Sequence, residues 1–157
     1  MNTTLRFLCI FALGAWVGSI FYFSAAVAPG AFRLFSQDQA GLLVEFTLWR
    51  LHVLGEIAAA IFLLASLLLM LSASGVIRTL LPPTIGVVVM LVLTLVSQHV
   101  VIRRMTALRR QMVSVSSTPP DNPLRVEFDR LHGVSVNLEG AVLLIGFVSL
   151  FLTVRLK

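Results

Sequence analysis

Four long apolar runs, separated by short polar stretches, dominate the pattern of this chain. Residues 7–32, 57–77 and 79–102 contain no Asp, Glu, Lys or Arg, and residues 133–154 contain only Glu139. A helix that spans a bilayer needs about 20 apolar residues. The pattern therefore predicts an all-α fold, an integral membrane antiparallel four-helix bundle.

Turn residues and capping residues predict where these helices begin and end. The Pro-Gly pair at residues 29–30 is a strong helix breaker, and the two prolines at 82–83 suit a first helical turn. Asn122 can cap a helix that starts with Pro123. Residues 30–44 are expected to form a short connector at the membrane interface, partly helical. The sequence thus predicts a single domain over residues 1–157, with helices at about 5–28, 46–72, 82–112 and 123–155.

Composition and charge narrow the class of protein further. Only 12% of the 157 residues are charged, and the mean hydropathy is +0.98. A soluble domain of this size has too little interior to bury so much apolar surface. The net charge of +5 would suit a nucleic acid, but no soluble basic face is predicted to bind one. We therefore expect the lipid bilayer as the partner and no nucleic acid.

The basic residues instead predict an orientation in the membrane. Lys and Arg gather beside cytoplasmic loops, and eight of the 12 flank the connections after the first and third helices. This bias predicts a bacterial inner-membrane protein whose connection between the third and fourth helices is cytoplasmic. The eight are Arg33, Arg50, Arg103, Arg104, Arg109, Arg110, Arg125 and Arg130.

The tripeptide Arg-Leu-His opens both the second and the fourth apolar run, at residues 50–52 and 130–132. An acid follows deeper in each run, Glu56 in one and Glu139 in the other. The repeat suggests a duplicated hairpin, with chance as the alternative. The third helix runs the opposite way, so its end should meet both openings; that end carries Thr94, Ser97, Gln98, His99 and Arg103. The expected polar cluster comprises His52, Glu56, His99, His132, Ser135, Glu139, Arg50 and Arg103.

Two hypotheses explain such a cluster. A charged group in hydrocarbon costs about 2.5–3.5 kcal/mol, so both acids should face inward, either neutral or partnered. In the first hypothesis the protein binds or carries a ligand: His52, His99 and His132 would hold a transition metal or haem, or the acids and histidines would relay protons. In the second, the same side chains only join helices in a membrane scaffold or assembly subunit.

Motif spacing favours the second hypothesis. The chain contains no HxxxH, HxxE or CxxC motif, which are the tight spacings that would indicate a metal site. Nothing resembles an activated nucleophile either, so an enzyme is the third hypothesis.

The first apolar run also contains a GxxxG pair. Gly14 and Gly18 flank Trp16, and small residues let helix backbones approach closely. The pair predicts either packing within the chain or a homo-oligomer through the first helix. Internal packing is favoured in a protein with four helices, and Trp16, in mid-span, is expected to face a neighbouring helix.

Two segments resemble a known family, the transmembrane protein 205-like domains. These are small four-helix membrane domains of unknown function. The first run resembles their first helix through Trp16, Gly18, Phe21, Phe23, Pro29 and Phe32. Residues 132–135 (HGVS), followed by Asn137, resemble their last helix. The resemblance implies a multi-pass membrane domain without settled biochemistry. A weaker similarity, through histidine placement alone, connects the chain to four-helix membrane families that handle haem or copper.

Overall fold

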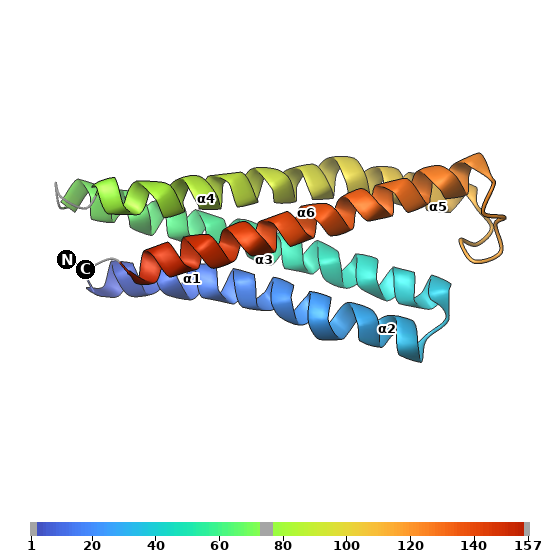
Figure 1. Cartoon of the computed structure of the whole chain (residues 1–157), viewed down its shortest axis with the longest axis horizontal. Helices are drawn as coiled ribbons and strands as arrows, with labels where there is room; N and C mark the ends of the chain where they lie inside the picture. Colours follow the sequence, from blue (N-terminus) through green and yellow to red (C-terminus); the bar gives the residue numbers. More distant parts are fainter. Residues whose placement is uncertain (1–2, 73–76, 156–157) are drawn as a thin grey trace.

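A computed structural model describes residues 3–72 and 77–155, and every regular element in them is helical. Four rods lie side by side, and the start of α1 and the end of α6 lie at the end of the bundle opposite α2 and α5 (Figure 1). Lys157 and the side chain of Arg78, both counted for the orientation, lie outside the described residues. The elements are α1 (Thr3–Tyr22), η1 (Phe23–Val27), α2 (Ala28–Leu34), α3 (Gln37–Ser72), α4 (Ile77–Val96), η2 (Ser97–Ile102), α5 (Arg103–Gln111) and α6 (Pro123–Val154).

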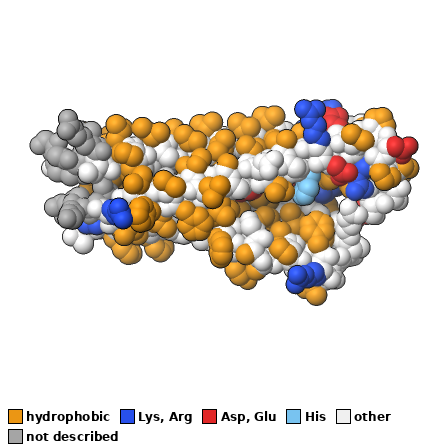
Figure 2. Space-filling model, in the orientation of Figure 1, with side chains coloured by type: hydrophobic (Ala, Val, Ile, Leu, Met, Phe, Trp, Pro, Cys, Tyr) orange, Lys and Arg blue, Asp and Glu red, His pale blue; other side chains and the backbone are white. Residues whose placement is uncertain are grey.

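All four rods are long and apolar enough to cross a membrane. Their mutual contacts form a ring, in which α1 packs on α3, α3 on α4, α4 on α6 and α6 on α1. Trp16, Phe62 and Met90 are among the fully buried side chains of the shared interior. The outer surface is apolar along most of the visible face, and charged side chains gather towards the ends (Figure 2). Such an apolar exterior suits lipid better than water.

The first rod continues beyond the predicted end at residue 28. It passes through the π-helical segment η1 and reaches Leu34 in α2. Pro29 follows η1 closely, in the first turn of α2. The wider π turn just before it accommodates the proline ring, so the helix continues where a break was expected.

The second rod begins nine residues before the predicted start at 46, at Gln37. Gln39, at the third helical position, reaches back to Ser36: its Oε1 accepts hydrogen bonds from Ser36 Oγ at 3.0 Å and from Ser36 N at 3.4 Å. The second of these bonds is the half of a capping box in which the Glu or Gln side chain binds the backbone N–H of the capping residue. The expected connector is therefore almost entirely helical, and only residues 35–36 separate α2 from α3.

The starts of the other two rods differ in how well they were predicted. Asn122 caps α6, because its side-chain oxygen accepts a hydrogen bond from Leu124 N at 2.9 Å, which confirms the prediction there. The third rod starts at Ile77 rather than at 82 and keeps Pro82 and Pro83 inside it. The hydrogen bonds that these prolines cannot make belong to the first turns, where the loss is tolerated in membrane helices.

Candidate functional site

His52 lies in the centre of the bundle and joins three of its rods. Its side chain projects from α3 and is only 2% exposed. Nδ1 lies 2.8 Å from Oε1 of Gln98 in η2, and Nε2 lies 2.5 Å from Oε1 of Glu139 in α6. Because α3 and α6 face each other across the ring, the His52–Glu139 contact spans its interior. Both ring nitrogens of this histidine are therefore occupied by protein partners.

Glu139 belongs to the buried face of α6. Ser135, one turn earlier, is also buried, and Ser149 and Thr153 continue the same face towards the other end. The spacing of these positions, three or four residues at a time, keeps them on one side of the helix. As the sequence predicted, both acids of the cluster lie at least partly inside the bundle.

Two hollows flank His52, and each is lined by one of its two hydrogen-bond partners. The α3–α5 groove, about 730 Å³, runs between α3 and the η2–α5 segment and is lined by Gln98, His99 and Arg103 among others. The α2–α6 cleft, about 610 Å³, opens between α2 and α6 and is lined by His132, Ser135 and Glu139 among others. His52 thus lies between a glutamine that faces one hollow and a glutamate that faces the other.

Two further polar atoms lie buried on the same helices. Oε1 of Glu56 and Oγ of Ser97 have no hydrogen-bond partner among the described residues. Glu56 follows His52 by one turn of α3, about 6 Å deeper along the axis. Thr94, one turn before Gln98, is also buried. Polar groups therefore continue inward from the His52–Glu139 contact.

The structure divides the predicted cluster instead of gathering it in one place. His99 and His132 are exposed and line different hollows, so the three histidines do not converge. In the described part of the chain, no three His, Cys, Asp or Glu residues are placed to hold a metal ion. Among the described residues Arg50 forms no ion pair with Glu56 or Glu139, and its guanidinium lies 3.5 Å from the ring centroid of Phe46 instead. The three histidines of the described chain therefore do not form one shared metal centre.

Packing of the GxxxG pair within the chain was also predicted, and this is wrong. A Cβ atom built on Gly14 or Gly18 would meet nothing within 4 Å among the described residues. Trp16 is buried, and successive residues turn by about 100° around a helix, so residues two positions away lie on roughly the opposite side. The close approach is instead at Gly55, where a Cβ atom would lie 2.3 Å from Trp16 Nε1.

The polar contacts that sequence reasoning missed fix the end of the bundle around the site. Glu45 on α3 accepts a hydrogen bond from Thr106 Oγ1 at 2.6 Å and pairs with Arg109 of α5. Asp38 accepts from Val115 N at 3.0 Å and holds the connection to α6 against the start of α3. No local motif marks these pairs, because each joins residues more than 60 positions apart.

The fold and the site define a helical, multi-pass transmembrane class of protein. Comparison with protein families gives a narrower assignment: the chain belongs to the family described as domain of unknown function DUF4149, whose model matches residues 11–114. No curated protein and no solved structure matches the chain.

Proposed function

We propose that this protein is an antiparallel four-helix bundle of the bacterial inner membrane that binds and relays protons through His52 and Glu139. The connection between α5 and α6 would be cytoplasmic, because most Arg residues lie at that end. The observation that carries the proposal is the buried 2.5 Å contact between His52 Nε2 and Glu139 Oε1.

The cost of burying charge supports a proton at this contact. A lone charge in the bilayer interior costs about 2.5–3.5 kcal/mol even on the lenient scale. A neutral imidazole beside a protonated Glu139, or an imidazolium beside its carboxylate, holds the same number of protons and no net charge. In both forms Nδ1–H donates to the Gln98 oxygen, which matches the 2.8 Å contact. The pair is therefore suited to hold one proton.

The surroundings supply a route to and from that proton. Glu139 lines the α2–α6 cleft, so it can exchange protons with solvent at the α5 end. Towards the opposite end, further polar side chains lie inside the bundle, at Glu56, Thr94, Ser149 and Thr153. An imidazole can accept a proton on one nitrogen and release it from the other, which suits His52 to the central position.

Two finer assignments accompany this proposal. On the residues of the first and last helices named above, we place the chain with the transmembrane protein 205-like domains. A second copy would pack on the outward Gly14 and Gly18 face of α1, because nothing in the described chain covers it. Replacing Gly18 with Leu would then reduce the particle size in detergent, and an unchanged size would contradict this packing.

One observation favours a second function, that of a membrane scaffold. His52 uses both ring nitrogens to connect α3 with η2 and α6, which is what a purely structural residue would do. The two functions differ in what Glu139→Gln should do, since glutamine keeps a hydrogen bond to the imidazole but cannot exchange a proton.

A vesicle assay separates these functions. Purified protein is reconstituted into vesicles that contain a trapped pH dye, and the decay of an imposed pH gradient is followed with the membrane potential clamped. We expect the wild type to dissipate the gradient faster than Glu139→Gln. Glu127→Gln is the matched control, because this acid pairs with Arg104 outside both hollows. Equal decay in the wild type and in Glu139→Gln would contradict the proton relay and favour the scaffold function.

A further inference from the structure

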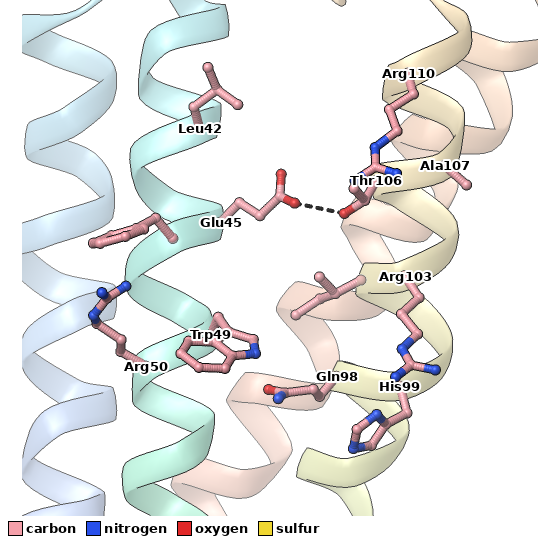
Figure 3. Close-up of a pocket in the computed structure, with 12 residues that line it drawn as sticks. Leu42, Glu45, Trp49, Arg50, Gln98, His99, Arg103, Thr106, Ala107 and Arg110 are labelled. Atoms are coloured by element: carbon pink, nitrogen blue, oxygen red, sulfur yellow. Dashed lines mark hydrogen bonds between the residues drawn. The ribbon is translucent and has the colours of Figure 1, made fainter.

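The α3–α5 groove has a lining that the proposed proton site does not explain. Figure 3 shows Glu45 and Trp49 on α3 facing the helix that carries His99, Arg103 and Thr106. The groove lies at the end of the bundle where the charged side chains concentrate, so in a membrane it would open at the headgroup level. Its lining joins basic residues to large apolar ones.

The basic residues of α5 occur as two adjacent pairs. In each pair, one arginine forms an ion pair with a carboxylate and the other does not. Arg104 pairs with Glu127 at 2.8 Å, and Arg109 pairs with Glu45. The other member of each pair, Arg103 or Arg110, lines the groove and has no carboxylate within 4.0 Å among the described residues. Orientation in the membrane requires only that positive charge be present, and it does not explain why the unpaired guanidiniums share one groove.

Helical spacing explains how these groups come together. His99, Arg103 and Arg110 follow one another at intervals of four and seven residues, which places them along one side of the rod. Glu45, the acid of the groove, is already bound by Arg109 and Thr106, so it does not neutralise Arg103 or Arg110. The groove therefore carries uncompensated positive charge.

The opposite wall of the groove, on α3, carries large apolar and aromatic side chains beside Glu45 and Arg50, and the Arg50 guanidinium lies over the Phe46 ring. Phe46 and Trp49 of α3 are 57% and 52% exposed, and Leu42 continues this surface by one turn. Tryptophan commonly lies at the level of lipid headgroups. A ligand that fits both walls has an anionic head and an apolar chain.

We propose that the α3–α5 groove binds an anionic phospholipid, with its phosphate at Arg103 and Arg110 and an acyl chain against Phe46 and Trp49. Guanidinium groups suit phosphate because they donate two parallel hydrogen bonds, and basic pockets between membrane helices bind such headgroups. The proposal rests on residence in the membrane but not on the proton site.

The two tryptophans make this testable by fluorescence, because Trp16 is buried and Trp49 lines the groove. The protein is titrated in detergent micelles with phosphatidylglycerol or phosphatidylcholine carrying brominated acyl chains, which quench a tryptophan that they touch. We expect phosphatidylglycerol to quench at the lower mole fraction. A Trp49→Phe variant, which should lose this quenching, identifies the responding residue.

Substitution of neighbouring arginines provides the decisive comparison. Arg103→Gln and Arg110→Gln should each raise the mole fraction of phosphatidylglycerol that gives half of the maximal quenching by about fivefold. Arg104→Gln, one residue away but outside the groove, should leave it unchanged, and melting curves verify that each variant is folded. The proposal is overturned if both lipids quench equally, if Arg104→Gln acts like Arg103→Gln, or if inorganic phosphate reverses the quenching and so reveals a site for soluble anions.

Discussion

The two Arg-Leu-His segments have the same sequence but opposite surroundings. His52 of the first is buried and hydrogen-bonded on both ring nitrogens, whereas His132 of the second is exposed at the rim of the α2–α6 cleft. The acids differ as well, because Glu139 pairs with the histidine of the other segment and Glu56 keeps a buried oxygen without a partner in the described residues. The role of each histidine is therefore decided by the helices opposite it and not by its own tripeptide.

Removing each histidine should give the largest contrast between the segments. His52→Ala would leave Glu139 and Gln98 buried without their common partner, and we expect it to destabilise the fold by about 3–5 kcal/mol. His132→Ala removes an exposed side chain and should change stability by less than about 0.5 kcal/mol. Unfolding in detergent, followed by circular dichroism, measures both. Similar losses for the two variants would mean that the segments are equivalent after all.

The glycines near each segment should differ in the same direction, with a smaller effect. Gly55→Ala would push a methyl group into the buried indole of Trp16 and should cost about 1–3 kcal/mol. A Cβ atom added to Gly140, beside Glu139, would meet nothing within 4 Å among the described residues. Gly140→Ala should therefore stabilise α6 by about 0.5–1 kcal/mol. The same unfolding assay applies, and a stable Gly55→Ala protein would show that α1 and α3 are not in close contact.

Chemical modification should distinguish the histidines without any change in stability. Diethyl pyrocarbonate acylates accessible imidazoles, so we expect it to modify His132 and His99 in the folded protein while His52 stays unmodified. Peptide mass spectrometry locates the adducts. Early modification of His52, at the rate seen for His132, would contradict its burial.

Much of the fold could be predicted from the chain, because apolar run length and caps are local signals. The four rods and the start of α6 at Asn122 and Pro123 follow from such signals. The signal for the start of α3 was also local, in Ser36 and Gln39. It was missed because residues 30–44 were interpreted as an interfacial connector. The continuation past Pro29 depends on a π turn that no residue pattern indicates.

The candidate site was harder to predict, since helical spacing fixes a shared face but not what lies opposite it. His132, Ser135 and Glu139 share a side of α6 as expected, yet only the last two are buried, because the bundle opens into the α2–α6 cleft near His132. Gln98 was only one of several polar residues at its helix end until the structure placed it beside His52. Contacts between distant rods decide such partnerships.

Infrared difference spectroscopy across a pH titration tests most directly whether His52 and Glu139 share a proton. We predict that bands of the Glu139 carboxyl and the His52 imidazole change together at one pH, and that Glu139→Gln removes both while Glu127→Gln removes neither. Bands that change at separate pH values, or an imidazole band that survives Glu139→Gln unaltered, would contradict the shared proton on which this account depends.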